Sequence, residues 1–473
     1  MKNRLYIVIA ILMLAVSAKA QLPNQNMVLL KNLNQHGTNY SALWGYTAPN
    51  GREYAILGCN TGTSFVDITD SANIHEIKFF TGVTSQWREM KTYSHYAYVV
   101  SEGSQSKIQI FDLQYLPDSV HFVKTTNFPS HSSTHSITDY GDGRYKFLNG
   151  CNSSFVVNGG VAIMDCIDPE NPVIRGKAGV ATGGNTNGYV HDCKARNDTL
   201  WTCNIYTGYC TIYNIANKDS IKLIRAFKEY APGGVSTHTI DFHKYNNKYM
   251  YVCDEITGTI TGKMNIWDIS DPTSYTQIGT WNPTNITTAD VHNMTVYGNY
   301  GVIANYTAGI RLVDLSNPAV PNEIAWYDTY PSNNASAFNG CWEIFMFPSK
   351  KIIGSDIQTG LYVVKPTLTL TDIGYNNYAS SQIPSSIELK QNYPNPFNPS
   401  TKINFSLPKN SFVSLKVYNL AGKQVADLVN DRRDGGNYEV NFDAGKYGLS
   451  SGAYFYSLTA DGYTETKKMI LVK

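Results

Sequence analysis

A short apolar run that ends in one polar residue recurs seven times along the chain. These final residues, here called the tag residues, are Asp67, Asp112, Asp165, Asn214, Asp268, Asp314 and Lys365, so successive tags lie 45, 53, 49, 54, 46 and 51 residues apart. A repeat of roughly 40–50 residues with several strands per unit is typical of β-propeller blades. Because one such unit cannot bury its own faces, the units are expected to stack around an axis. We therefore predict an all-β chain in which residues 39–366 form a seven-bladed β-propeller, preceded by a lead-in over residues 21–38.

Within each unit the alternation of apolar and polar residues predicts four strands, of which the third carries the tag. In the fifth unit the pattern places strands near residues 239–242, 249–252 and 264–269. An Asp at a strand end accepts hydrogen bonds from backbone amides two residues on and closes an Asx turn, so we interpret the tags as structural. Six or eight blades remain open alternatives, since the segments before Thr61 and after Gly360 can share one closing blade.

The two ends of the chain follow other patterns. Lys2 and Arg4 precede an apolar stretch over residues 5–16, and Ala18-Lys19-Ala20 supplies a small-residue cleavage site. This predicts a signal peptide over residues 1–20. A membrane anchor is the alternative, but the apolar stretch is shorter than the roughly 20 residues that a span needs.

After a polar linker over residues 367–386, alternating segments predict a small C-terminal β-sandwich over residues 387–473. The expected strands cover residues 402–407, 413–420, 438–442, 453–460 and 464–472. This segment contains neither His nor Cys.

Four motifs of the C-terminal segment resemble the type A sorting domain of the type IX secretion system. The matching residues are Asn392–Thr401, Val417–Gly422, Ser451–Tyr454 and Lys467–Lys473. The resemblance implies that the secretion machinery is a partner and that the protein crosses the outer membrane. It further implies that the mature protein is secreted or attached to the outer-membrane surface.

The repeats resemble the LVIVD-repeat, choice-of-anchor B family. Leu312-Val313-Asp314 comes nearest to the name-giving motif, and further matching residues are Trp87–Glu89, Tyr189–Asp192, Asp254-Glu255, Asn305–Arg311 and Ser355–Leu361. This resemblance implies a propeller held at a cell surface and implies no particular activity.

The charge and cysteine content of the chain limit the kinds of molecule that it is expected to bind and the bonds that it can form. The formal net charge is +1 and Lys and Arg are dispersed, so nothing indicates a nucleic-acid-binding surface. The chain has 8 Cys, and export permits disulfides. A turn near Asn197-Asp198 is expected to place Cys193 roughly opposite Cys203, where the two can form a disulfide; the connectivity of the other cysteines stays open.

When the units are aligned, the residues at the start of the first strand include side chains that can bind a ligand or take part in catalysis. Four successive units place a histidine there, namely His135, His191, His238 and His292, followed by residues such as Asp192, whereas flanking units have Arg88-Glu89 and Trp342-Glu343. The next strand ends at Glu102, Asp254-Glu255, Asn305 or Asp356 in the corresponding units. Antiparallel pairing brings both sets to one face. If the first strand is innermost, they surround the mouth of the central channel.

Imidazoles and carboxylates that converge are ligands for Zn²⁺, Mn²⁺, Fe²⁺ or, with more oxygen, Ca²⁺. The candidate ligands for a metal or another bound group are His135, His191, Asp192, His238, Asp254, Glu255, His292 and Asp356, and the expected channel mouth adds Arg88, Glu89, Glu102, Asn305 and Glu343.

Three functions are compatible with this pattern. The leading hypothesis is an exported recognition module for a glycan, peptide or small molecule, with a polar, metal-binding channel mouth. The alternative is a metal-assisted extracellular hydrolase or lyase in which His191, His238 and His292 hold the metal and Asp254, Glu255 or Asp356 acts as base. The third is a purely structural domain in which histidine recurs for packing alone.

Overall fold

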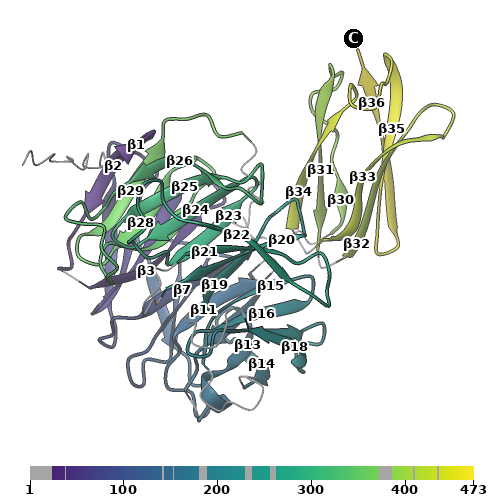
Figure 1. Cartoon of the computed structure of the whole chain (residues 1–473). Helices are drawn as coiled ribbons and strands as arrows, with labels where there is room; N and C mark the ends of the chain where they lie inside the picture. The colour runs from purple at the N-terminus through teal and green to yellow at the C-terminus, as the bar shows by residue number, and fades with distance from the viewer. Residues whose placement is uncertain are drawn as a thin grey trace, which may run out of the picture.

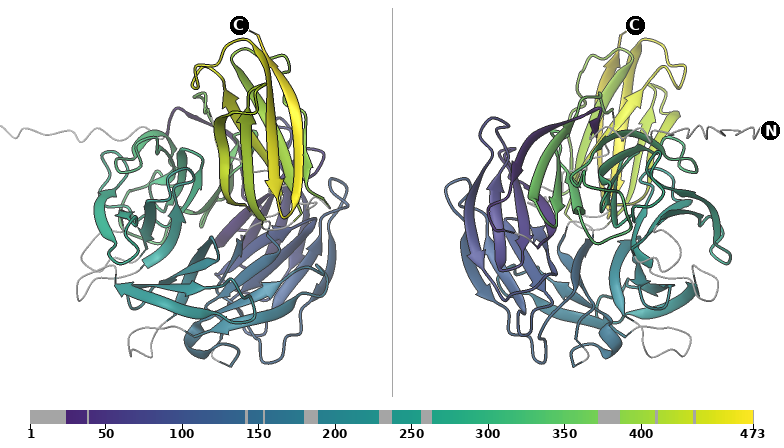
Figure 2. Two further views of the ribbon diagram at one scale, coloured as in Figure 1. Left: turned by 90° about the vertical axis from the view of Figure 1, so that its right-hand side faces the viewer. Right: turned by 60° about the vertical axis from the view of Figure 1, so that its left-hand side comes forward.

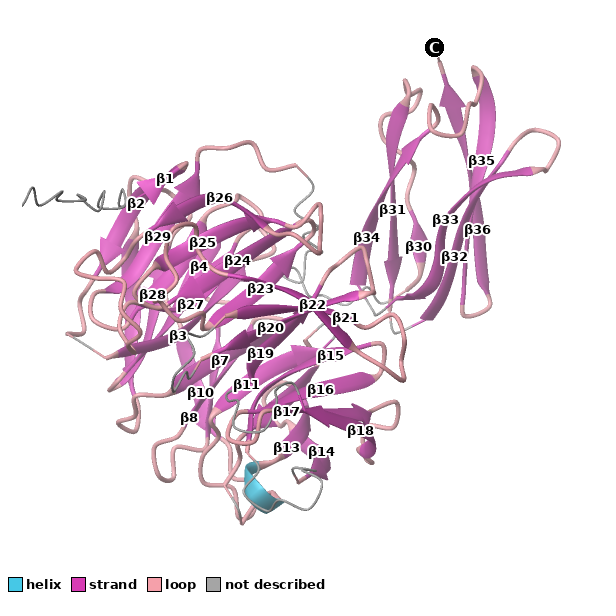
Figure 3. Ribbon diagram, viewed as in Figure 1, coloured by secondary structure: helices cyan, strands magenta, loops and turns pink. Residues whose placement is uncertain are grey.

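The computed structural model describes residues 24–37, 39–140, 143–152, 154–179, 189–228, 237–255, 263–371, 386–408, 411–433 and 436–472. The predicted signal peptide and most of the predicted linker lie outside these residues. The described chain is all-β apart from one turn of 3₁₀ helix at Val157–Gly159 (Figure 3). No helix among these residues is long and apolar enough to cross a membrane.

The described part of residues 24–366 folds into seven antiparallel sheets, six of them built on four successive strands and the seventh on three successive strands and one from the start of the chain (Figure 1). The first three sheets contain β3 (Tyr40–Thr47), β4 (Glu53–Cys59), β5 (Gly62–Asp67) and β6 (His75–Thr81); β7 (Arg88–Tyr93), β8 (Tyr96–Ser101), β9 (Ile108–Asp112) and β10 (His121–Thr125); and β11 (Ser136–Tyr140), β12 (Tyr145–Asn149), β13 (Val161–Asp165) and β14 (Val173–Ala178). The fourth and fifth sheets contain β15 (Val190–Arg196), β16 (Thr199–Asn204), β17 (Tyr209–Asn214) and β18 (Lys222–Lys228); and β19 (Thr237–Phe242), β20 (Tyr249–Asp254), β21 (Met264–Asp268) and β22 (Thr276–Trp281). The sixth sheet contains β23 (Asn293–Tyr297), β24 (Tyr300–Asn305), β25 (Gly309–Asp314) and β26 (Asn322–Tyr327), with β1 (Asn24–Gln25) at its edge, and the seventh contains β27 (Cys341–Met346), β28 (Ile352–Asp356) and β29 (Gly360–Pro366) with β2 (Met27–Leu33).

The first strand of each sheet is the innermost one. The first strands β3, β7, β11, β15, β19, β23 and β27 contact one another in a closed cycle, with β27 returning to β3. The sheets therefore radiate from a central axis, as the two views in Figure 2 show. This is the propeller fold that the repeat predicts.

The ring is closed by a strand from the start of the chain. β2 pairs antiparallel with β29 and becomes the outer strand of the seventh sheet. Residues 27–33 of the predicted lead-in thus belong to the propeller. The sequence did not indicate this, because an outer strand carries no tag.

The tags close turns as predicted. Six of them accept a hydrogen bond from the backbone amide two residues later, at N···O distances of 2.7–3.1 Å; the pairs are Thr69 to Asp67, Gln114 to Asp112, Ile167 to Asp165, Ala216 to Asn214, Ser270 to Asp268 and Ser316 to Asp314. The recurring residue that reveals the repeat is thus the residue that ends the third strand.

The predicted Cys193–Cys203 disulfide is wrong. Asn197 and Asp198 both have positive φ, 50° and 56°, and form a two-residue turn. This turn pairs Cys193 with Thr202 and Asp192 with Cys203. A shift of one residue reverses the face on which a side chain lies, so the two thiols point away from each other. The Cys193 sulfur instead lies 2.9 Å from the hydroxyl of Thr138.

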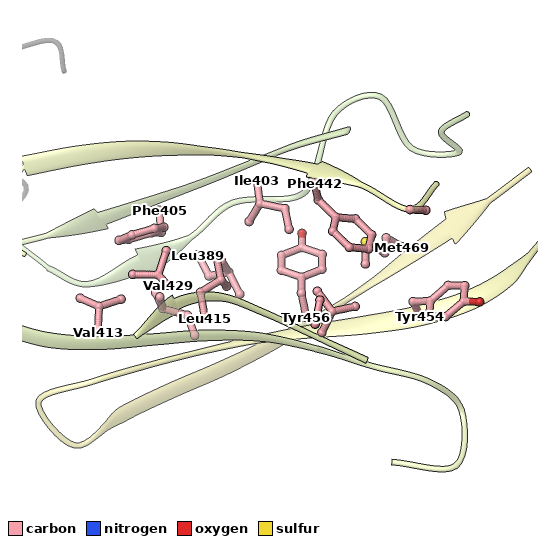
Figure 4. Close-up of a cluster of buried hydrophobic side chains, with 14 of the residues drawn as sticks. Leu389, Ile403, Phe405, Val413, Leu415, Val429, Phe442, Tyr454, Tyr456 and Met469 are labelled. Carbon is pink, nitrogen blue, oxygen red and sulfur yellow. The ribbon is translucent and has the colours of Figure 1, made fainter. Parts of the chain in front are cut away.

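The C-terminal segment folds into two sheets packed face to face around an apolar core that includes Phe405, Leu415 and Tyr456 (Figure 4). One sheet contains β30 (Glu388–Leu389), β31 (Ser400–Leu407) and β34 (Gly436–Asp443); the other contains β33 (Gln424–Arg433), β32 (Ser411–Tyr418), β35 (Gly452–Ala460) and β36 (Tyr463–Leu471). The predicted β-sandwich is confirmed. Strand β33 was not anticipated, because its alternation is interrupted by charged residues.

Candidate functional site at the channel mouth

The four aligned histidines form a row along one end of the inner strands. His191 and His238 lie near the starts of β15 and β19, and His135 and His292 directly precede β11 and β23. Successive ring centroids are 4.0, 4.1 and 4.2 Å apart. All four line one pocket together with Trp87, Arg88, Glu89, Asp192, Trp342 and Glu343. We call this pocket the channel mouth.

Hydrogen bonds at one end of the row fix which nitrogen carries the proton. His135 donates from Nδ1 to Glu102 Oε1 at 2.7 Å, and the Tyr189 hydroxyl donates to the same oxygen at 2.7 Å. His135 Nε2 lies 2.7 Å from His191 Nε2. In the neutral rings His135 Nε2 therefore accepts, and His191 donates from Nε2. The lone pair of His191 is left on Nδ1, which is buried without a hydrogen-bond partner.

The other end of the row is fixed in the same way. His292 donates from Nδ1 to the carbonyl oxygen of Trp342, so its lone pair lies on Nε2. This atom is 3.5 Å from Glu255 Oε1, and His238 Nε2 is 3.6 Å from Glu255 Oε2. His238 Nδ1 lies 2.9 Å from the Thr239 hydroxyl, and its Nε2 is buried without a hydrogen-bond partner. Tyr306 donates its hydroxyl to Glu255 Oε1 at 2.6 Å.

Burial keeps three of the imidazoles neutral. It lowers the pKa of His191 and His238 well below the usual value and lowers the pKa of His292 to about 3. Burial also raises the pKa of Glu255. At Glu102 the hydrogen bonds from His135 and Tyr189 outweigh burial and lower the pKa. Ligand atoms of His191, His238 and Glu255 lie within 4.8 Å of one another.

A second polar layer follows the histidines by one residue along the inner strands. Thr239 donates to Asp192 Oδ2 at 3.1 Å, and Asn293 donates to Glu343 Oε2 at 2.8 Å. Glu89 pairs with Lys91 Nζ at 2.6 Å. Burial raises the pKa of Asp192 to about 7 and that of Glu343 to about 8. Asp192 therefore supports His238 through Thr239 and does not itself contact an imidazole.

Several predicted residues do not join the histidines. Asp356 accepts from the amides of Gln358 and Thr359 and closes the turn between β28 and β29. Asp254 accepts from Asn265 at 2.7 Å. Asn305 is buried at the end of β24. Among the described residues, the carboxylates that pair with the four histidines are Glu102 and Glu255. The alignment of strand ends could not separate these two from carboxylates that close turns.

Two functional contacts were missed by the sequence reasoning. Tyr189 and Tyr306 were not among the predicted site residues, yet each donates its hydroxyl to a carboxylate that contacts a histidine. Their positions carry a weak signal, since each tyrosine lies within two residues of an aligned site residue.

Comparison with family models identifies two parts of the chain. Residues 289–329 match the LVIVD repeat, and residues 391–473 match the secretion system C-terminal sorting domain. The chain contains an LVIVD repeat and a secretion sorting domain. The sorting domain directs the protein through the type IX secretion system, after which it is attached to the cell surface or released.

Solved structures resemble the chain at low identity. A hypothetical selenium-binding protein from Sulfolobus tokodaii is 10% identical with a TM-score of 0.50, covering 85% of this chain and 94% of its own. The periplasmic gluconolactonase of Pseudomonas aeruginosa is 10% identical with a TM-score of 0.47, covering 85% and 99%. A protein from Lactobacillus plantarum is 10% identical with a TM-score of 0.48, covering 85% and 99%. Similarity of this size concerns the fold alone. A search of curated proteins found no match.

Proposed function

We propose that the propeller is an exported recognition module whose channel mouth holds a divalent transition metal through His191, His238, His292 and Glu255. The single observation that carries the proposal is the convergence of His238 Nε2 and His292 Nε2 on the Glu255 carboxylate, whose Oε1 also accepts from Tyr306. His292 Nε2 and His238 Nε2 both lie near Glu255 oxygens, at 3.5 and 3.6 Å.

This arrangement lacks a positive charge. With His292 donating from Nδ1 and its ring kept neutral by burial, the lone pair on His292 Nε2 faces the acceptor carboxylate of Glu255. Acceptors that meet in a buried place repel one another unless a cation or a proton lies between them. A divalent ion supplies that charge and satisfies the buried nitrogens of His191 and His238.

The spacing suits a transition metal. Zn–N and Zn–O bonds of about 2.0–2.1 Å at tetrahedral angles place neighbouring ligand atoms about 3.3 Å apart. The separations of 3.5 and 3.6 Å are close to this distance. A set of imidazoles with one carboxylate suits Zn²⁺, Mn²⁺ or Fe²⁺ better than Ca²⁺, which prefers oxygen ligands.

Outer contacts would hold these ligands in place. Trp342 accepts from His292, and the Thr239 hydroxyl lies 2.9 Å from His238 Nδ1. Such contacts orient metal-binding histidines and set their tautomers. A divalent ion with one carboxylate leaves a net charge of +1, which favours a ligand with an anionic or polar oxygen. Trp87 and Trp342 in the pocket wall offer faces for stacking on a glycan, a peptide or a small molecule.

A metal-assisted hydrolase or lyase is the second candidate. It is favoured by the compact set of His191, His238 and Glu255, because catalytic zinc sites use three protein ligands and keep one position open. Turnover of an ester, lactone or glycan that needs His238 would support this reading over pure binding.

The test is metal analysis of the purified full chain, with titration of Zn²⁺ and Mn²⁺ into chelator-treated protein. We expect about one ion per chain and a loss of affinity of more than tenfold in His238→Ala. His95→Ala is the matched control, because His95 lies in the turn between β7 and β8 and contacts Asp112. Absence of saturable metal binding, or equal binding by His238→Ala, would overturn the proposal.

A further inference from the structure

A second cavity lies between the first two sheets, with a lining that runs from the inner strand β7 to the outer strand β10. It has a volume of about 200 Å³. Its polar lining comprises Arg88 from β7, Ser101 from β8, Gln105, Ser106 and Lys107 from the β8–β9 loop, Gln109 from β9 and Thr125 from β10. Because about 10–15 Å³ is enough to hold one water, this cavity has room for a larger polar group.

The cavity borders a buried cation that has no counter-ion. Arg88 is 2% exposed. Its guanidinium donates to two backbone carbonyls, that of Cys59 from Nε at 3.1 Å and that of Val83 from Nη2 at 2.6 Å. It makes no ion pair with any described residue. These two bonds leave further guanidinium donors and the whole positive charge to be compensated.

Other buried cationic side chains of the propeller have a carboxylate partner. Arg311 lies 3.3 Å from Glu323, and Lys351 lies 3.3 Å from Glu53, with all four side chains almost fully buried. A buried charge without a partner is strongly unfavourable. Unlike Arg311 and Lys351, Arg88 has no carboxylate partner in the described part of the chain, and its side chain lines the cavity.

The rest of the lining offers groups that bind an anion. The Ser101 hydroxyl is buried without a hydrogen-bond partner. Ser101 in β8 is the direct cross-strand neighbour of Arg88 in β7, so the two side chains lie next to each other in the sheet. Val99, Gln109 and Thr125 form one cross-strand row over β8, β9 and β10. Lys107 adds a second positive charge, held at 2.7 Å from Asn127 Oδ1.

Gly82 makes room for the guanidinium. A Cβ atom at this position would lie 2.8 Å from Arg88 Nη1. Any larger residue would therefore press on the donor group that faces the cavity. We propose that the cavity between the first two sheets is a binding site for a small oxyanion, a sulfate or carboxylate group, held by Arg88, Ser101 and Lys107.

Two sources can supply this group: a free inorganic anion or an acidic saccharide. The planar guanidinium binds either group through paired N–H donors. The side chains of Gln109 and Thr125 supply additional polar groups for saccharide hydroxyls.

Equilibrium dialysis of the full chain against labelled sulfate at constant ionic strength tests the site, with D-glucuronate as competitor. We expect one saturable site, weakened by about tenfold or more in Arg88→Met and less strongly in Ser101→Ala. Competition by glucuronate would extend the site to acidic saccharides, whereas sulfate binding without competition would limit it to the inorganic ion. Both results support an oxyanion site.

His238→Ala serves as the control, because loss of the metal site should leave sulfate binding unchanged. Ser101→Ala keeps the test decisive if Arg88→Met fails to fold. Sulfate binding that is equal in the wild type and both cavity variants, or no saturable binding of either anion, would overturn the inference.

Discussion

At the scale of single residues, the buried polar groups differ in whether they have a hydrogen-bond or ion-pair partner. The tag Asp165 shows a complete match: its carboxylate closes a turn and also binds Arg144 at 2.7 Å and Arg175 at 3.2 Å. The histidine row shows an incomplete one, because nitrogens of His191 and His238 are buried without partners. A buried polar group with all its partners, such as Asp165, stabilises the fold. Buried nitrogens without partners, as in His191 and His238, indicate where a ligand can bind.

The tautomers of the histidines can be measured directly. At neutral pH without metal, ¹⁵N NMR shifts should show His292 protonated at Nδ1, because only a donor can face the Trp342 carbonyl. His191 should be protonated at Nε2, because His135 accepts from it. Spectra in which His292 carries its proton on Nε2 would contradict this assignment.

Asp165→Asn should lower the free energy of unfolding at pH 7 by about 2 kcal/mol, because it weakens charged hydrogen bonds between the buried Asp165 and the partly exposed Arg144 and Arg175. Burial alone would raise the pKa of Asp165, but the bonds from Arg144 lower it below the usual value. The carboxylate therefore stabilises the fold above its unfolded-state pKa of about 3.9, and this contribution is lost as the pH falls through the folded-state pKa.

Urea unfolding should thus show the largest gap between wild type and Asp165→Asn near neutral pH and a smaller gap near pH 3. Asp314→Asn is the control, since Asp314 closes the same turn without an arginine partner among the described residues. A gap that does not change with pH would argue against the ion pair.

At the scale of elements, the outer strand of the seventh sheet comes from the start of the chain. β2 covers the edge of β29 and contributes Met27, which is 2% exposed, together with the partly buried Leu30 and Leu33. An uncovered edge strand and an opened apolar face both weaken a sheet protein and favour association. β2 is therefore a structural requirement of the ring.

Deletion of residues 24–33 should lower the free energy of unfolding by at least about 3 kcal/mol, as expected for loss of two or three buried apolar side chains. Urea unfolding and light scattering would measure the loss and the association. Deletion of residues 391–473 is the control, because it leaves the seven sheets of the propeller complete. Equal stability of the two deletions would show that β2 does not hold the ring.

At the scale of the whole molecule, two folds with separate tasks share one chain. The sorting domain over residues 391–473 serves export, and the propeller carries the pockets. Deletion of residues 391–473 should therefore leave the protein inside the cell envelope while metal binding by the propeller is unchanged. Immunoblots of the medium and of surface fractions would test this, and surface delivery of the truncated chain would contradict it.

The sequence predicted those features that recur with the repeat. The turn closed by Asp67 and the alignment of His191 with His238 follow from a period that is visible in the residues alone. Features set by local geometry could not be predicted: the turn at Asn197-Asp198 shifts Cys193 by one residue, and that shift reverses its face. Likewise, residue type alone cannot separate a turn-closing carboxylate such as Asp356 from one that contacts imidazoles.

The pairing of β2 with β29 also sets an order of events in time. As the chain is synthesised, residues 27–33 precede their partner at residues 360–366 by more than three hundred residues. The circle of sheets can be completed only when nearly the whole propeller has been made. The segment that follows next is the one that addresses the outer membrane, so a chain interrupted early has neither a finished ring nor an exit signal.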